Sequence, residues 1–439
     1  MDFTQHTDET VRLLQDLIRI DTTNPPGNET PCVNYIAQVL EREGIPSQIF
    51  ESAPGRGNLV ARLKGDGSAA PFMLFGHVDV VPAEADKWLH PPFSAELIDG
   101  VIWGRGTTDM KDMVVMNLMT FITLKRQGAK LKRDVIFMAN ADEETGGVFG
   151  AKWMVENHPE LINAEYALTE GGGNAIQLDG QTFYTCSTGE KGSARFKLRG
   201  RGKPGHASQP HPGNAILALA KALQAVIEKA TPVHITKTVR AHVEGLAQQV
   251  NPALGSMLRE ALDPERNLAA LDALPLPEGT RRMMYAMTHN TTTPTILRGG
   301  TKINVVPGEV EAEVDCRVLP GATPESIAAE VRAIVGDGVE VEFGPFSPGI
   351  ESDPASPLFE LIKRKMGETG GIVIPNLITG GTDARHVTKL GTKVYGFAPA
   401  LYEGDELTGL AHAHNERVTV KNLMYGTGMI YDITKEFCC

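Results

Sequence analysis

The sequence predicts an α/β fold that is interrupted by a second, smaller α+β domain. In residues 1–187, short apolar runs alternate with stretches of helical periodicity. Between residues 188 and 346 the order changes to strand, helix, two strands, helix, strand, and the first pattern returns over residues 347–439. A chain of 439 residues with 41% hydrophobic content is long enough to bury the cores of two domains.

In the first domain, buried parallel strands are expected where short apolar runs are bounded by glycine or polar residues. These runs lie at 72–75, 135–139, 166–168 and 393–397. The helices expected in the same domain cover residues 7–20, 32–43, 110–127, 357–368 and 421–435. Gly128 follows the third of these helices, where a glycine commonly ends a helix.

The inserted domain has the β-α-β-β-α-β order of a ferredoxin-like α+β fold. Its strands are expected at 193–200, 293–299, 310–318 and 339–343, and its helices at 214–228 and 324–335. Residues 231–290, between the first helix and the second strand, are rich in alanine, leucine, methionine and charged residues. We expect this segment to be a mainly helical insertion.

The overall composition excludes several classes of partner. A net charge of −12 argues against a surface for nucleic acid or for anionic membranes. No apolar run is long enough to span a membrane, and the first 20 residues lack the basic and apolar regions of a signal peptide. Five cysteines without a CxxC pair favour reduced thiols, so a cytoplasmic location is expected.

Acidic residues and histidines follow the predicted strands at the point where each one ends. His77 and Asp79 follow the first apolar run, Glu143 and Glu144 the second, and Glu170 the third. In an open α/β sheet, ligands bind outside the carboxyl ends of the strands. Two further residues reach the same edge from loops, namely Asp109 in a glycine-rich turn and His412 after the strand at 393–397.

This collection of side chains predicts a metal site. Crowded carboxylates raise one another's pKa unless cations compensate them, and mixed imidazole and carboxylate ligands suit Zn²⁺ or a similar ion. In an extended chain His77 and Asp79 share a face, so Asp79 can accept the second N–H of the imidazole. Glu143 and Glu144 are adjacent and point in different directions, so one can bind metal while the other acts as a base.

Other catalytic motifs do not fit. Residues 200–205 match the glycine pattern of a dinucleotide site, but the proline-rich stretch that follows cannot open the required helix. The sequence has no GxxxxGK[ST], HExxH or GxSxG motif, so it lacks the signatures of P-loop nucleotide hydrolases, single-zinc peptidases and serine hydrolases.

The chain resembles the di-zinc amidohydrolase family of aminoacylase, succinyl-diaminopimelate desuccinylase, acetylornithine deacetylase and glutamate carboxypeptidase. The motifs that carry the resemblance occur along nearly the whole chain. They are Gly76-His-Val-Asp79, Trp103 to Asp109, Asp142-Glu-Glu144, Glu170-Gly-Gly172, Gly205-His-Ala-Ser208, Asn304-Val-Val-Pro307, Gly380-Gly-Thr-Asp-Ala-Arg385 and His412-Ala-His-Asn-Glu416.

The resemblance implies a zinc-exopeptidase-like mixed sheet flanked by helices, with the inserted domain acting as a lid and as a dimerisation domain. It implies two Zn²⁺ ions, with Co²⁺ or Mn²⁺ as substitutes. Asp109 would bridge the ions, and the Asp109–Met110 peptide would be cis. The remaining ligands would be His77 and Glu170 for one ion and Glu144 and His412 for the other.

Further roles are implied for residues around the metals. Glu143 would be the general base, and Asp79 would orient His77. His206 would reach the active site of a second subunit in a homodimer and stabilise the tetrahedral intermediate. Arg385 would bind the substrate carboxylate, although a structural ion pair with Asp383 or a nearby acid is an alternative role. Asn304 is a further candidate for substrate contact. The family's spacing selects His412 over His414, which is then a polar loop residue.

These expectations predict a hydrolase that cleaves the amide bond of a small substrate with a free carboxylate, such as an N-acyl amino acid. A di- or tripeptidase or a carboxypeptidase with the same chemistry is the alternative. A non-catalytic binding protein on the same fold is a remote one, because all five ligand positions and Glu143 are intact. The sequence leaves the acyl group and the amino acid open.

Overall fold

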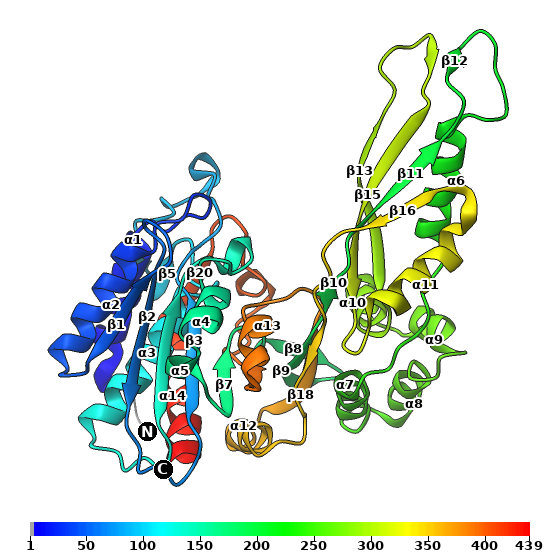
Figure 1. Cartoon of the computed structure of the whole chain (residues 1–439). Coiled ribbons are helices and arrows are strands. Elements are labelled where there is room, and N and C mark those ends of the chain that lie inside the picture. The colour runs from blue at the N-terminus through cyan, green and yellow to red at the C-terminus, as the bar shows by residue number, and fades with distance from the viewer. Residues whose placement is uncertain (1–3) are drawn as a thin grey trace. The chain divides into compact units, whose positions relative to one another are not determined.

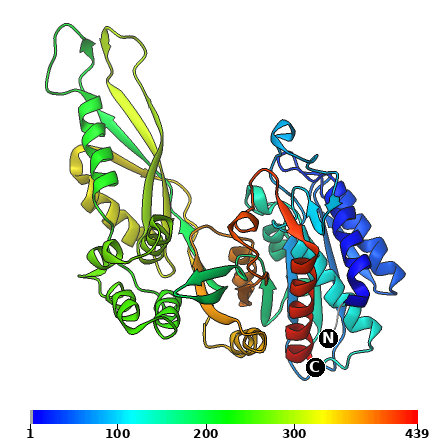
Figure 2. The same cartoon turned by 180° about the vertical axis from the view of Figure 1, so that it is seen from behind.

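The computed structural model describes residues 4–439 and divides the chain into two compact units (Figures 1 and 2). The first unit comprises Met1–Thr188, Ser352–Asn376 and Thr382–Cys439, and the second comprises Gly189–Glu351 and Leu377–Gly381. The first three residues of the predicted first domain, including the start of the segment tested for a signal peptide, lie outside the described residues. The role of the second unit as a lid or dimerisation domain stays a prediction.

The first unit is built on a mixed sheet in which the central strands are parallel. β6 (Val135–Asn140), β3 (Phe72–His77), β7 (Tyr166–Thr169) and β19 (Lys393–Gly396) are neighbours in this order and run in the same direction. Antiparallel strands flank them, namely β1 (Ser47–Glu51), β2 (Gly57–Leu63), β8 (Ala175–Leu178) and β9 (Gln181–Glu190). β18 (Ile372–Ile378) also pairs with β9. The predicted α/β class with a mixed sheet is therefore confirmed.

Helices cover this sheet. They are α1 (Thr7–Arg19), α2 (Thr30–Arg42), α3 (Lys111–Arg126), α4 (Ala151–Asn157), α5 (Pro159–Ile162), α12 (Pro357–Gly367), α13 (Ala384–Val387) and α14 (Val420–Cys438). Every residue of α3 from Lys111 to Leu124 is buried, because α1 and α14 pack against it on the sheet. Figure 2 shows α14, in red, lying along the strands. β4 (Glu96–Ile98), β5 (Val101–Trp103) and β20 (Arg417–Thr419) form a separate small sheet, and β20 leads directly into α14.

The second unit contains a five-stranded antiparallel sheet, in which β13, β15, β11 and β16 are neighbours in this order. These strands are β11 (Phe196–Arg201), β13 (Thr291–Gly299), β15 (Glu309–Val318) and β16 (Glu340–Phe343), and short β10 (Gly192–Ser193) also pairs with β15. Helices α6 (Ala215–Glu228) and α11 (Pro324–Val335) bury their apolar residues against the sheet. At one end of the unit, β12 (Gly205–His206) and β14 (Val305–Val306) form a two-stranded ribbon.

Residues 231–290 contain four helices. They are α7 (Lys237–Ala247), α8 (Pro252–Glu260), α9 (Asn267–Ala273) and α10 (Glu278–Thr288). The buried amine of Lys191 donates hydrogen bonds to the carbonyl groups of Ala286 and His289, which joins α10 to the strand region. None of the helices within residues 4–439 is long and apolar enough to cross a membrane.

Candidate metal centre

The parallel strands deliver their final residues to one place. His77 is the last residue of β3, Glu143 and Glu144 begin the short turn Glu143–Thr145 after β6, and Glu170 follows β7. One ligand atom each from His77, Asp109 and Glu144 lie within 4.8 Å of one another, and the same holds for His77, Glu143 and Glu170.

Asp109 lies between two groups of side chains. Its Oδ1 is 3.2 Å from His77 Nε2, which is also 3.7 Å from Glu170 Oε1. Its Oδ2 is 3.1 Å from His412 Nε2, which is also 3.1 Å from Glu144 Oε2. The Asp109–Met110 peptide is cis, as predicted. The structure thus brings all five predicted ligands together, with Asp109 shared, and their role in metal binding stays a prediction.

The charges in this cluster are compensated only by imidazole. Within residues 4–439, no lysine or arginine forms an ion pair with Asp109, Glu144 or Glu170. Burial and the charge of Glu170 raise the pKa of Glu143 well above its usual range. Hydrogen bonds with Asp109 and Glu144 raise the pKa of His412 to about 10.

The other members of the cluster show the same crowding. Burial raises the pKa of Glu170. Burial alone would lower the pKa of His77, but the charge of Glu170 and hydrogen bonds with Asp109 and Asp79 raise it well above its usual value. Oε1 of Glu144 is buried without a hydrogen-bond partner. These imidazole and carboxylate groups have raised pKa values, and one buried carboxylate oxygen has no partner. Such a set of groups fits divalent cations such as Zn²⁺.

Asp79 supports two parts of the cluster at once. His77 Nδ1 lies 3.0 Å from the main-chain oxygen of Asp79 and 3.4 Å from its Oδ1. The imidazole is therefore held more closely by the main-chain carbonyl than by the carboxylate. The carboxylate accepts hydrogen bonds from the backbone N–H groups of Glu143 and Glu144 and from the amide of Asn24. Asp79 thus positions the ligand on β3 and the turn after β6 together.

A buried pair that sequence reasoning did not select connects the loops of Asp109 and His412. The Glu416 carboxylate accepts hydrogen bonds from the backbone N–H groups of Gly106, Thr108 and Asp109 at 3.0, 2.7 and 3.2 Å. Arg105 donates to the same carboxylate at 2.6 Å and to the main-chain oxygen of His412 at 3.4 Å. We name this pair the Arg105–Glu416 clamp. The only signal in the sequence was that Glu416 ends the His412 motif, since its burial and its backbone partners become visible only in the structure.

Asp142 supports the turn of Glu143 and Glu144 from the other side. Its φ is 70°, in the left-handed region, where aspartate is more readily accommodated than most residues. Its carboxylate accepts hydrogen bonds from Arg56 at 2.7 Å, from Asn24 at 3.1 Å and from the Thr145 hydroxyl at 2.5 Å. Arg56 and Asn24 come from distant segments without a recognisable motif, so sequence reasoning missed them.

Arg385 has no carboxylate partner in the part of the chain that the structure describes. Its Nε donates a hydrogen bond to His386 Nε2 at 3.2 Å. The alternative role in an ion pair with Asp383 is not observed, since Asp383 accepts instead from the Asn140 amide at 2.5 Å. The half-buried guanidinium is therefore available to an anionic ligand.

The remaining predicted residues lie elsewhere. His206 and Asn304 belong to the second unit, where the backbone N–H of Ala207 donates to the main-chain oxygen of Asn304. His206 is exposed, and its Nδ1 lies 2.7 Å from the hydroxyl of Ser208. His414 pairs with Glu84 at 2.9 Å, outside the group around Asp109.

The model of peptidase family M20/M25/M40 matches residues 73–436. The chain belongs to this family. The M20 assignment identifies it as a metal-dependent amidohydrolase or metallopeptidase. A probable carboxypeptidase S-like 2 from Dictyostelium discoideum is 31% identical over 394 residues, which cover 86% of this chain and 74% of the relative. Mouse aminoacylase-1 is 26% identical, with 93% of this chain and 90% of the relative covered.

Solved structures of M20 proteins share the fold. The metallo-carboxypeptidase Sso-CP2 from Sulfolobus solfataricus matches with a TM-score of 0.69 at 19% identity, and 97% of this chain and 98% of that chain are covered. The predicted resemblance to the aminoacylase and carboxypeptidase family is thus confirmed.

Proposed function

We propose that this M20 protein is a two-metal hydrolase that cleaves the amide bond of N-acyl amino acids. The observation that carries the proposal is the position of Asp109, with one carboxylate oxygen beside His77 and Glu170 and the other beside His412 and Glu144. Two zinc ions, or Co²⁺ or Mn²⁺ in their place, would be held by these five residues. When bound, such ions supply Lewis acidity that makes water nucleophilic near neutral pH.

Glu143 is the general base in this proposal. Its carboxylate belongs to the cluster, and burial with the nearby charge of Glu170 raises its pKa. A raised pKa makes a carboxylate a stronger proton acceptor. Glu143 accepts a proton from the attacking water and returns it to the leaving amine. Asp79 keeps the Glu143 backbone in place through the hydrogen bond to its N–H.

Arg385 binds the carboxylate of the substrate in this scheme. A guanidinium can donate two parallel hydrogen bonds to a carboxylate, and that of Arg385 has no ion-pair partner among residues 4–439. Substrates whose carboxylate is esterified should therefore be poor.

The second unit supplies His206 and Asn304 in this proposal. We propose a homodimer formed through the second unit, in which His206 of one copy stabilises the oxyanion in the site of the other and Asn304 contacts the substrate. The exposure of His206 and the complete exposure of the neighbouring Ile303 side chain, at 99%, support a surface that meets another molecule.

The five free cysteines support a cytoplasmic location.

A carboxypeptidase or a di- or tripeptidase is the second candidate, because the carboxypeptidase S-like relative shares 31% of aligned residues. The chemistry is the same, so substrates must decide. The test is hydrolysis of N-acyl amino acids and dipeptides that share one C-terminal residue, by protein loaded with zinc and by protein stripped with a chelator. Faster zinc-dependent cleavage of the N-acyl compounds is expected. Faster cleavage of the dipeptides would favour the peptidase, and zinc binding without cleavage would leave only a binding protein.

A further inference from the structure

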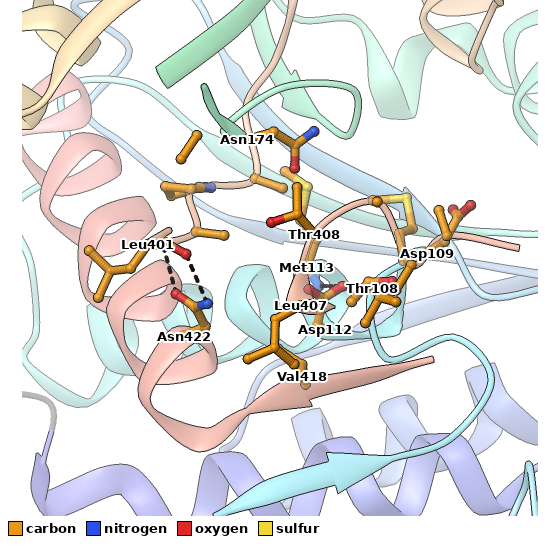
Figure 3. Close-up of a pocket in the computed structure, with 18 of the residues that line it drawn as sticks. Thr108, Asp109, Asp112, Met113, Asn174, Leu401, Leu407, Thr408, Val418 and Asn422 are labelled. Atoms are coloured by element: carbon orange, nitrogen blue, oxygen red, sulfur yellow. Dashed lines mark hydrogen bonds between the residues drawn. The ribbon is translucent and has the colours of Figure 1, made fainter. Parts of the chain in front are cut away.

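A cavity of about 240 Å³ in the first unit has the predicted metal ligands Asp109 and Glu170 in its wall. Figure 3 shows Asp109 at this cavity. The cavity lies between the start of α3, the loop after β7 and the loop of residues 398–411. It is smaller than the roughly 300–1,000 Å³ of sites that enclose a whole drug-sized ligand. Its size therefore suits one chain of a substrate whose reacting group lies at Asp109 and Glu170.

Many of the residues that line the cavity are apolar. They include Met110, Met113, Met116, Leu401, Leu407, Leu410 and Val418, together with Ala398, Pro399 and Ala400. Met113 and Met116 lie on α3, and Met110 is the residue before this helix. Their thioether side chains give the wall a flexible surface that adapts to ligands of different shape. Figure 3 shows Met113, Leu407 and Val418 around the same space.

Two polar side chains of the cavity, those of Asn422 and Glu403, are already engaged in hydrogen bonds. Asn422 exchanges hydrogen bonds with the backbone of Leu401, and Glu403 accepts from Asn422 and from the Thr419 hydroxyl. The carboxylate of Glu403 is also 3.4 Å from Lys421. Asp112 is buried and accepts a hydrogen bond from the backbone N–H of Met113, and its burial raises its pKa to about 8, which disfavours the charged form. Glu403 and Asp112, the lining carboxylates other than the predicted metal ligands, therefore attract a free ammonium group less than unpaired, charged carboxylates would.

The cavity also lacks a free cation. Arg417 is the one basic residue in its lining, and its guanidinium donates to the main-chain oxygens of Asn415 and Glu406 and lies over the ring of Trp103. Neither Arg385 nor the turn of Glu143 lines the cavity. The group that would bind a substrate carboxylate and the apolar wall are thus separate parts of the site.

We infer that this cavity binds the aliphatic acyl chain of the substrate, so that the enzyme prefers N-acyl amino acids with chains of several carbons over N-acetyl amino acids. The inference rests on the proposed function, because it assumes that the scissile carbonyl lies at Asp109 and Glu170. Leu407 is the last residue of the turn Asp405–Leu407, and its half-buried side chain lines the cavity. In this inference Leu407 determines which acyl chains the cavity accepts.

The test uses the N-acetyl, N-butyryl, N-hexanoyl and N-octanoyl forms of one amino acid with zinc-loaded protein. Burial of each added methylene should raise kcat/KM by up to about fourfold until the cavity is filled. Leu407→Trp, which fills the cavity, should lower the ratio of hexanoyl to acetyl kcat/KM by about tenfold or more, the value of two lost methylenes. Ala400→Leu narrows the same space and serves if Leu407→Trp does not fold. Leu97→Trp, at a leucine of β4 that is 46% exposed and outside the cavity, is the matched control and should leave the ratio unchanged.

A binding measurement separates this inference from the proposed function. Zinc-loaded Glu143→Gln protein is titrated calorimetrically with the acetyl and hexanoyl compounds. A tighter Kd for the hexanoyl compound, with a more negative heat-capacity change and loss of both in the Leu407→Trp background, supports the cavity as the acyl site. Hydrolysis without dependence on chain length, together with equal Kd values, overturns the inference and leaves the proposed function intact. A Kd that depends on chain length without hydrolysis by the unmutated protein supports the cavity and overturns the proposed function.

Discussion

The two units differ in how firmly hydrogen bonds and burial hold the predicted site residues in place. In the first unit, Asp79 and the Arg105–Glu416 clamp hold the ligand loops through backbone hydrogen bonds and are almost completely buried. In the second unit, His206 is exposed on a two-stranded ribbon, and the hydrogen-bonding side chain at its Nδ1 is that of its neighbour Ser208.

This difference bears on metal binding by the first unit and on the proposed role of His206 in the second. A metal cluster needs ligands that are fixed before the ion binds, and the first unit provides this through groups beneath the ligands. An exposed histidine beside the fully exposed Ile303 is not fixed in this way by its own ribbon. Its catalytic role then depends on contact with another surface, which is the part of the proposal that experiments can break most directly.

The largest effect is expected for Asp109→Ala. One carboxylate faces both groups of ligands, so its removal should lower metal content at both positions together. Activity should fall by more than the roughly 10²–10⁴-fold expected for loss of a general base, because the activated water is lost as well. Metal content by mass spectrometry and initial rates measure the two effects. Retention of two metals per chain would show that Asp109 is not shared.

Glu143→Gln should separate catalysis from metal binding within the first unit. The substitution removes the base and keeps the side-chain volume, so kcat should fall about 10²–10⁴-fold while metal content stays at two per chain. Glu160→Gln, at an exposed glutamate of α5, is the control and should leave both quantities unchanged. Substantial turnover by Glu143→Gln would assign the base to another residue.

His206→Ala tests the second region. If His206 stabilises the oxyanion, kcat should fall about 10²–10³-fold without loss of metal, because the contact forms mainly in the transition state. Mixing this protein with Glu143→Gln protein should restore activity as subunits exchange, since a mixed dimer contains one site with both residues. Exchange is followed with a fluorescent label on each protein. Demonstrated exchange without recovered activity would contradict the role across subunits.

The same contrast explains what could be read from the sequence. His77 and Glu170 could be placed because each follows a short apolar strand, and strand ends in an α/β sheet meet at one edge. The strands β9 and β18 were not predicted, because β9 mixes Thr, Ser and Cys without alternation and β18 contains Pro375.

The supporting network was less accessible to prediction. The hydrogen bonds of Asn24 and Arg56 to Asp142 join segments that are 118 and 86 residues apart. No local periodicity records such pairs, because they arise only when loops from different strands pack together. Glu416 lay inside a quoted motif, but its role depends on backbone N–H groups that the sequence does not specify.

The smallest effect is expected for Glu416→Gln, which weakens the clamp and leaves every ligand in place. A glutamine keeps one acceptor oxygen, but its amide group places donors where the carboxylate accepted from Arg105 and from three backbone N–H groups. Since such supporting partners typically contribute 10–100-fold to metal affinity, zinc should bind about 10–100-fold more weakly. Competition with a chelator measures this affinity.

The matched control lies in the other region. Glu330 of the second unit is also a largely buried carboxylate, and it accepts hydrogen bonds from His234 and Asn290. Glu330→Gln should lower thermal stability and leave zinc affinity unchanged. Glu416→Gln should weaken zinc binding, and the protein should stay folded. Equal zinc affinities in the two variants would mean that the ligand loops hold their positions without the clamp. The preorganisation assigned to the first unit would then rest on Asp79 and Asp142, the carboxylates that hold the turn of Glu143 and Glu144.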